Sequence, residues 1–239
     1  MKKPKKITIK FFLNTNLQAI AINKNEEGYP LYMQITYDRR NTQIKCRYGA
    51  FYTHIDSVKK EQNALLNFEE YLLRRVTEYE LKRLETTFQL KGLGDIYDGY
   101  SLSIYRLFNS YLKMRVKAVL KEAKPKEFLE IFNLDKSNTA FETIMQAAER
   151  LFDNFKTLLE DEIKQEIEIF ELYKEICKEI LVKDDYKFPI IMDWIDGTHQ
   201  LFLTKKLKQK FNNTNDYQAQ EQKLLGLLQK IITTKLELK

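Results

Sequence analysis

Cysteine and histidine are scarce in this chain of 239 residues, which has two of each. The two cysteines, Cys46 and Cys177, lie far apart in the sequence, so the chain has no disulfide framework and fits synthesis in a reducing compartment. Clustered Cys and His residues are also the usual ligands of zinc, and the sequence contains no such cluster. We therefore expect a protein that uses no metal ion and no other cofactor.

Glycine and proline are also few, with seven and four residues. Both interrupt regular structure, so their scarcity favours long helices and strands over a loop-rich fold. The apolar runs fall short of the roughly 18–20 residues that cross a bilayer. The basic start, Met1–Lys6, is followed by a segment that Thr8 and Lys10 interrupt, unlike the apolar region of a signal peptide. The sequence thus predicts a soluble protein that is neither secreted nor inserted into a membrane.

Positive charge is concentrated at the beginning of the chain. The formal net charge is +6, and residues 1–50 contain ten Lys and Arg against three Asp and Glu. Residues 51–239 contain thirty against thirty-one and are nearly neutral. Such asymmetry indicates a polyanionic partner, with nucleic acid first and an anionic membrane surface second. A charge bias that only improves solubility is the alternative.

The first 55 residues show the two-residue alternation of β-strands. Apolar and polar side chains alternate over Ile7–Leu13, Leu31–Tyr37 and Thr42–Tyr48, and a short run at Leu17–Ile22 is a further candidate strand. The turn residues Asp38–Asn41 join the second and third of these segments into a hairpin. We expect an antiparallel sheet of three or four strands, with one apolar face and one polar, basic face.

Beyond Ser57 the apolar residues recur with a helical period. The predicted helices cover residues 57–90, 101–121, 139–182, 190–203 and 217–238. Unbroken, the third would be roughly 60 Å long at 1.5 Å per residue. Gly92 is expected to end the first helix, and residues 92–99 are expected to connect it to the second.

The expected fold is therefore α+β, with a small N-terminal antiparallel sheet followed by a mostly helical bundle that has one long helix. We place a basic β domain at residues 1–56 and a helical domain at residues 57–239. Residues 101–124 carry six Lys and Arg against one Glu, whereas residues 138–180 carry eleven Asp and Glu against five Lys and Arg. We expect these two segments to pack antiparallel with complementary charges. Alternatively, the first could extend the basic surface of the N-terminal sheet.

Residues 26–44 read Glu-Glu-Gly-Tyr-Pro-Leu-Tyr-Met-Gln-Ile-Thr-Tyr-Asp-Arg-Arg-Asn-Thr-Gln-Ile. This segment resembles the N-terminal arm-DNA-binding domain of tyrosine recombinases from mobile genetic elements. In that family an acidic-Gly-x-Pro turn leads into a strand, a short basic turn and a return strand, and a helix follows. Lys6–Leu13 stands where the family has its opening strand, so the resemblance covers about 50 residues, or about 90 with the helix that follows. Gly49–His54 departs from the family, because it lacks the usual Trp-containing exit from the sheet.

The resemblance implies a small sheet that docks its polar face into a groove of double-stranded DNA, since a β-ribbon fits the major groove. Gln and Arg side chains would read base edges, and the other polar residues would hold phosphates. The residues that it implies face DNA are Lys10, Gln34, Thr36, Arg39, Arg40, Gln43, Lys45 and Arg47.

The catalytic residues of a tyrosine recombinase are not evident. The family's His-x-x-Arg element is missing, because Ser57 stands three residues after His54 and Phe202 three residues after His199. Residues 101–180 resemble the family's helical core-binding region only weakly, and we expect the remaining chain to be too short for a catalytic domain. The glycine-containing segment 92–99 is not followed by the Gly-Lys-Ser/Thr of a phosphate loop. We predict a protein that is not an enzyme.

Three functions remain open on this basis. The first is a structural subunit of a phage-like virion, such as an oligomeric ring at the portal–tail connector, located in the virion or the host cytoplasm. Its partners would be further copies of the chain, other structural proteins and the passing DNA. The second is a stand-alone DNA-binding accessory protein related to the arm-binding domain, and the third is a helical scaffold whose N-terminal segment binds a protein. The long helices and the basic N-terminal segment favour the virion subunit.

Overall fold

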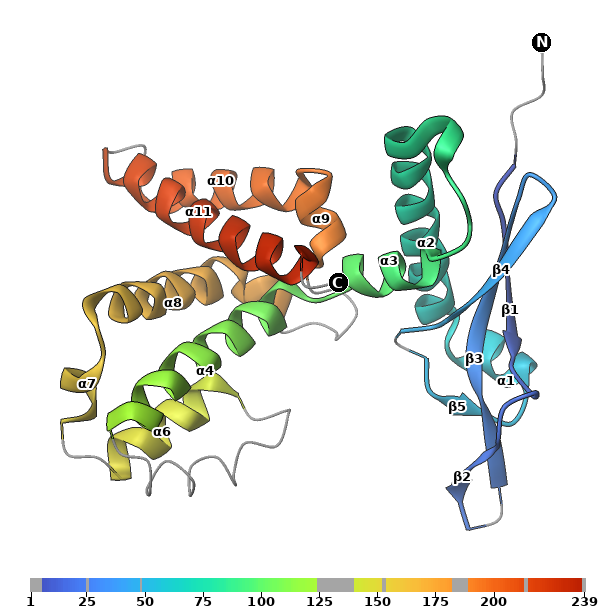
Figure 1. Ribbon diagram of the computed structural model, residues 1–239, viewed down its shortest axis with the longest axis horizontal. Helices are drawn as coiled ribbons and strands as arrows, with labels where there is room; N and C mark the ends of the chain where they lie inside the picture. The colour runs from blue at the N-terminus through green and yellow to red at the C-terminus, as the bar shows by residue number, and fades with distance from the viewer. Residues whose placement is uncertain are drawn as a thin grey trace. The chain divides into compact units, whose positions relative to one another are not determined.

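The computed structural model describes residues 6–24, 26–47, 49–123, 140–151, 154–181, 189–212 and 215–237. The chain forms two compact units, Met1–Ser101 and Leu102–Lys239. A sheet followed by helices makes up the N-terminal unit and helices make up the C-terminal unit (Figure 1), so the predicted α+β class is confirmed. The boundary predicted at residue 56 falls inside the N-terminal unit, because the helices up to residue 100 group with the sheet.

The central strand of the sheet pairs antiparallel with each of the others. The strands are β1 (Thr8–Leu13), β2 (Ile20–Asn23), β3 (Glu26–Tyr37), β4 (Arg40–Lys45) and β5 (Phe51–Tyr52). The C-terminal half of β3 lies between β1 and β4, because its residues 32–36 pair with both. The N-terminal half pairs with β2 and β5. The predicted hairpin is confirmed, but β3 begins at Glu26, five residues before the strand segment predicted from Leu31.

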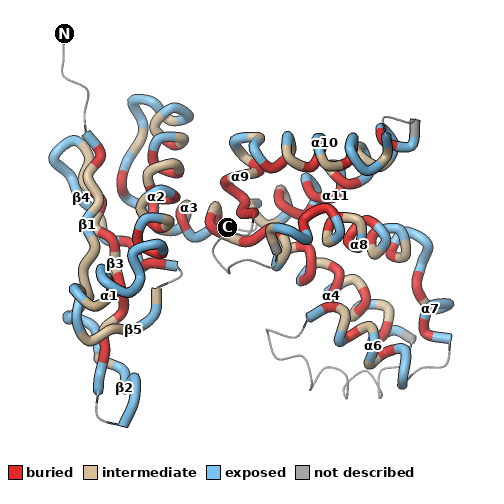
Figure 2. Tube along the Cα trace, turned by 180° about the vertical axis from the view of Figure 1, so that it is seen from behind, coloured by how far each residue is buried: buried red, intermediate tan, exposed pale blue. Residues whose placement is uncertain are grey.

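One face of the sheet is packed and apolar. Leu31, Met33 and Ile35 of β3 are at most 1% exposed, and Ile44 and Cys46 beside them are also buried. The helices of this unit are α1 (Ile55–Glu61), α2 (Asn63–Leu84), the short 3₁₀ helix η1 (Glu85–Thr87) and α3 (Leu93–Tyr100). Helices α2 and α3 lie on one side of the sheet (Figures 1 and 2), and the ring of Tyr37 packs edge-on against Phe88 with 5.8 Å between the ring centres.

The end of α2 differs from the prediction. Helix α2 stops at Leu84, because the backbone of Glu85 leaves the helical conformation, with a positive φ of 46°. Gly92, expected to end this helix, instead precedes α3 with φ of 82°, a conformation that glycine adopts readily. Residues 93–100, expected to connect two helices, themselves form α3.

Two buried carboxylates join α2 to α3. Glu69 and Glu80 are fully buried on α2. The hydroxyl of Tyr97 donates a hydrogen bond to Glu69, and that of Tyr100 donates one to Glu80 at 3.1 Å. Burial and the nearby Glu80 carboxylate raise the pKa of Tyr100 to about 12. Arg83 neutralises Glu80 with a guanidinium nitrogen at 2.5 Å, so the buried charge has the partner that it needs.

The C-terminal unit is built from helices of up to 23 residues in its described part. They are α4 (Ile104–Ala123), α6 (Phe141–Leu151), α7 (Phe155–Leu158), α8 (Asp161–Leu181), α9 (Ile191–Ile195), α10 (Thr198–Lys210) and α11 (Asn215–Glu237). The single long helix predicted over residues 139–182 is wrong. Asn154 has φ of 61° and Leu159 is extended, so this segment contains α6, α7 and α8. The helix predicted over residues 190–203 is also divided, into α9 and the start of α10.

Helices α4 and α8 pack antiparallel, as their charges predict. Tyr105 near the start of α4 stacks on Phe170, whereas Arg115 further along α4 pairs with Glu162 near the start of α8. Between them, Phe108 and Tyr173 are fully buried, with ring centres 5.8 Å apart. Figure 2 shows exposed stretches alternating with buried ones along both helices.

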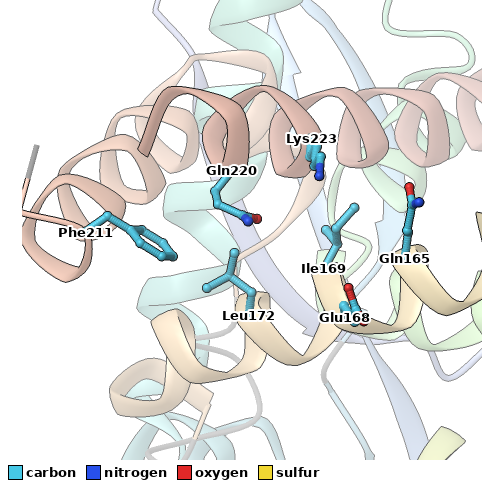
Figure 3. Close-up of a pocket in the computed structure, with 7 residues that line it drawn as sticks. All are labelled: Gln165, Glu168, Ile169, Leu172, Phe211, Gln220 and Lys223. Carbon is cyan, nitrogen blue, oxygen red and sulfur yellow. The ribbon is translucent and has the colours of Figure 1, made fainter. Parts of the chain in front are cut away.

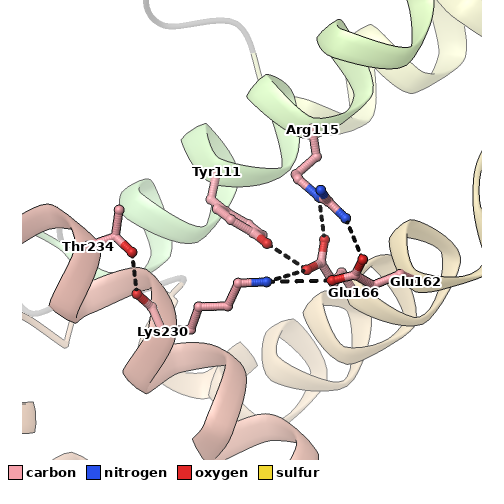
Figure 4. A network of polar contacts seen from close by, with 6 residues as sticks. All are labelled: Tyr111, Arg115, Glu162, Glu166, Lys230 and Thr234. Carbon is pink, nitrogen blue, oxygen red and sulfur yellow. Dashed lines mark hydrogen bonds and ion pairs between the residues drawn. The ribbon is translucent and has the colours of Figure 1, made fainter.

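A charged network joins α4, α8 and α11 (Figure 4). Glu166, whose side chain is 6% exposed, accepts hydrogen bonds from the Tyr111 hydroxyl at 2.5 Å and from Arg115 Nε at 3.1 Å. Lys230 of α11 lies 3.5 Å from both Glu162 and Glu166. Arg115 of α4 and Lys230 of α11 thus neutralise two carboxylates of α8, Glu162 and Glu166.

The described residues include neither a membrane-spanning helix nor a cluster of metal ligands. No helix there combines the length and the apolar character that crossing a membrane requires. No group of three or more His, Cys, Asp or Glu side chains in the same ranges could hold a metal ion.

Candidate nucleic-acid interface

Where β1, β3 and β4 pair, the sheet face opposite the packed apolar residues is polar and carries no carboxylate. The pairing of β1, β3 and β4 places nine side chains on it in three cross-strand rows. The rows are Thr8–Thr36–Asn41, Lys10–Gln34–Gln43 and Phe12–Tyr32–Lys45. None of the nine is buried, and we call them the open face. It carries two ammonium groups and three amides, with no negative charge to oppose them.

The open face offers complementary chemistry for a DNA groove. Lysine ammonium groups neutralise phosphates, and Gln and Asn amides carry the donor and acceptor that a base edge requires. The rings of Phe12 and Tyr32 lie 6.0 Å apart and add an apolar area, which suits contact with a thymine methyl group. The ammonium group of Lys45 lies over the ring of Phe51 at 5.8 Å, so its position is partly fixed.

The tight turn between β3 and β4 determines where Arg39 lies. Asp38 and Arg39 both have positive φ, 49° and 63°, and Tyr37 pairs directly with Arg40. Two central residues with positive φ characterise the type I′ turn, whose twist matches that of the flanking strands. Arg39 is therefore the exposed tip of the hairpin.

The structure brings together most of the residues implied by the resemblance. Lys10, Gln34, Thr36, Gln43 and Lys45 all belong to the open face. Sequence reasoning left out four members of that face as candidates, although the same alternation marks them. They are Thr8, Phe12, Tyr32 and Asn41.

The three arginines of the predicted set lie elsewhere. Arg39 is at the tip of the turn. Arg40 pairs with Tyr37, which places it on the packed side of the sheet, at its exposed end. Arg47 lies beyond the end of β4, and its guanidinium donates a hydrogen bond to the Asp98 carbonyl of α3 at 3.3 Å. Whether any of these residues contacts DNA stays a prediction.

The chain was compared with protein families, with curated proteins and with solved structures. None of them matches it. The likeness to arm-DNA-binding domains therefore stays a prediction that rests on the residues themselves.

A hollow between α8 and the α10–α11 region is a weaker candidate site (Figure 3). Its volume is about 210 Å³, and Ile169, Leu172 and Phe211 provide its apolar part. One carboxylate, Glu168, and one ammonium group, Lys223, also line it. These opposite charges offer no concentrated field that would select an ionic ligand.

A buried cluster in the C-terminal unit has the residue types of a catalytic site but not their properties. The Tyr173 hydroxyl lies 3.3 Å from His199 Nε2, and both residues are buried. Burial lowers the pKa of His199 to about 4 and raises the pKa of Cys177 to about 12. At neutral pH the imidazole is uncharged and the thiol protonated, so this cluster lacks the thiolate that a cysteine nucleophile requires. Tyr173, Cys177 and His199 are all buried in the interior of this unit.

Proposed function

We propose that this chain binds double-stranded DNA through the open face of its N-terminal sheet and catalyses no reaction on it. The observation that carries the proposal is the composition of that face. Where β1, β3 and β4 pair with one another, the nine side chains of the open face are ammonium, amide, hydroxyl and aromatic groups without a carboxylate, while the other face of the sheet is packed. Protein–DNA interfaces need cationic groups for phosphates and amides for base edges.

The size of the open face also supports a groove as its binding site. Neighbouring strands lie about 4.8 Å apart, so three strands span roughly 10 Å. The major groove is about 12 Å wide. The central strand, β3, would then lie deepest, with the Gln34 amide toward the base edges.

We favour DNA binding over the virion ring. The long helices of the chain favoured the ring, and the longest predicted one, over residues 139–182, is divided into α6, α7 and α8. A ring also requires a particle many times heavier than the 28.6 kDa chain. We expect a monomer or dimer when the mass in solution is measured, and a large defined oligomer would favour the ring.

Fluorescence anisotropy with a labelled duplex tests the proposal. We expect the affinity to fall steeply between about 50 and 200 mM salt, because each phosphate contact contributes a slope of about −0.9 in log affinity against log salt. The double variant Lys10→Gln/Lys45→Gln should lose roughly 1.8 of that slope, since it removes both cations of the open face.

The matched control is the double variant Lys60→Gln/Lys82→Gln, which removes the same charge from exposed positions on α1 and α2. It should keep the slope of the unaltered chain. Equal salt dependence for the two double variants would show that the open face makes no phosphate contact and would overturn the proposal. Affinity that does not vary with salt would do the same.

A further inference from the structure

A second basic feature lies at the tip end of the sheet. A hollow of about 510 Å³ is lined on one side by residues 39–42 of the hairpin and on the other by residues 89–91, before α3. We call it the tip hollow. Arg39, Arg40 and Lys91 line it together with the amides of Asn41 and Gln89.

Local structure holds both walls of the tip hollow in place. The type I′ turn and the β3–β4 pairing fix the hairpin wall. The opposite wall is anchored by Leu90, which is buried, and the Leu90 carbonyl accepts a hydrogen bond from the Leu93 amide at 3.2 Å. The contact between Tyr37 and Phe88 joins the two walls just behind the hollow. The hollow is therefore formed before any ligand binds.

The charge of the tip hollow selects an anion. Three of its lining side chains are cationic, and no carboxylate lines it. Among the described residues, neither Arg39 nor Arg40 nor Lys91 forms an ion pair. Like charges gathered in one hollow repel one another, so an anion that enters relieves this repulsion. A guanidinium group presents two parallel donors to a phosphate, and the neighbouring amides can donate further hydrogen bonds.

We propose that the tip hollow holds a backbone phosphate of the DNA that the open face contacts. This inference rests on the proposed function. The hollow lies at the β3–β4 turn, where these strands end. Nearly straight strands that lie along a groove leave its floor at their ends, because the groove winds around the duplex, so the turn comes near the phosphates that flank the groove. The proposal also gives Arg40 a role. Its side chain is on the packed side of the sheet and cannot reach base edges together with the open face, but it can reach a phosphate at the groove edge.

The substitution Lys91→Gln tests this site, because Lys91 is exposed and belongs to neither a strand nor a helix. Loss of one phosphate contact should make the salt slope less negative by about 0.9. The ratio of unaltered to variant affinity should therefore shrink about threefold between about 50 and 200 mM salt. The loss should be the same for duplexes of different sequence, since a phosphate carries no sequence information.

Two further variants make the result specific. Arg40→Gln should reproduce the effect of Lys91→Gln, because both side chains line the hollow. Gln43→Ala, on the open face, should weaken binding by different factors on different duplexes and leave the salt slope unchanged.

The outcomes separate the two proposals. If Lys91→Gln keeps the full salt slope while Lys45→Gln reduces it, the tip hollow holds no phosphate and the open face still binds DNA. If Lys91→Gln loses affinity for some duplexes only, the tip hollow is likewise not a phosphate site. If the unaltered chain binds no duplex at about 50 mM salt, the proposed function fails, and the tip-hollow inference fails with it.

Discussion

Replacing Arg39 with glycine should stabilise the hairpin while weakening DNA binding. Arg39 has φ of 63°, a left-handed conformation that costs a residue with a Cβ about 1–2 kcal/mol. Glycine adopts it freely, and Asp-Gly is a preferred pair for the type I′ turn. Glycine also makes the unfolded chain more flexible, which costs about 0.4–1 kcal/mol. The net expectation for Arg39→Gly is a gain of about 0.5–1 kcal/mol.

The assay must report on the hairpin itself. The single tryptophan, Trp194, belongs to the C-terminal unit, so its fluorescence does not follow the sheet. Native-state hydrogen exchange of the β4 amides that bond to β3 measures the opening free energy of the hairpin directly. We expect these amides to exchange about two- to fivefold more slowly in Arg39→Gly.

Arg39→Ala is the matched control, because it removes the same charge and keeps a Cβ at the left-handed position. Its β4 amides should exchange no more slowly than those of the unaltered chain. Both variants should lose affinity for duplex DNA by a similar factor, since both lose the guanidinium. A hairpin less stable in Arg39→Gly than in Arg39→Ala would refute the reasoning about the turn.

Three further predictions concern buried groups. Burial lowers the pKa of His199 to about 4, so the folded chain binds fewer protons than the unfolded chain between pH 6.5 and 4. The free energy of unfolding should therefore fall by about 3 kcal/mol as the pH falls through that window. Urea unfolding should show a flatter pH dependence for His199→Gln, and parallel curves would contradict this. Glu166→Ala, which removes a side chain only 6% exposed, should lower the unfolding free energy by about 2–3 kcal/mol. Glu162→Ala removes a side chain that is 59% exposed and should lower it by less than about 1 kcal/mol. Equal losses in thermal or urea unfolding would show that the burial of Glu166 adds nothing to stability. Burial raises the pKa of both Cys46 and Cys177, so a thiol reagent at pH 8 should label neither cysteine in the folded chain and both in urea. Fast labelling of the folded chain would contradict their burial.

The sheet could be predicted where alternation is regular, and could not where other residues interrupt it. The hairpin of β3 and β4 has clear alternation and a turn signal between its strands. The first half of β3 contains Gly28 and Pro30, which are typical of loops. Gly28 nevertheless pairs with Ile20, and a Cβ there would lie 2.4 Å from the Ile22 side chain and 3.0 Å from the Tyr52 backbone nitrogen. Close packing of β2 and β5 against β3 explains this glycine, and only the folded structure shows it.

The helices were predicted in type but not in their ends. Apolar residues keep a helical spacing across residues 139–182, so periodicity alone does not show that the backbone leaves the helix at Asn154 and Leu159. Gly92 was expected to end a helix, but a left-handed glycine also fits just before one, and the sequence does not distinguish the two places.

The open face could be predicted largely because strand alternation determines which side chains share a face. Arg40 stands two residues before Thr42 and four before Ile44 in the strand, so alternation alone places its side chain on the packed side of the sheet. The resemblance had implied that Arg40 faces DNA. Arg47 stands two residues after Lys45, so alternation would place it on the open face, but β4 ends at Lys45. Its contact with Asp98 joins residues 51 positions apart, and local patterns do not encode such a contact.

The central position of β3 affects how the protein can fold during translation. Every strand that β3 pairs with lies within a few tens of residues of it in the chain, so the sheet closes only short loops. The N-terminal unit ends at Ser101, and a nascent chain emerges from the ribosome N-terminus first. The sheet can thus assemble during translation, while the bundle is still being synthesised.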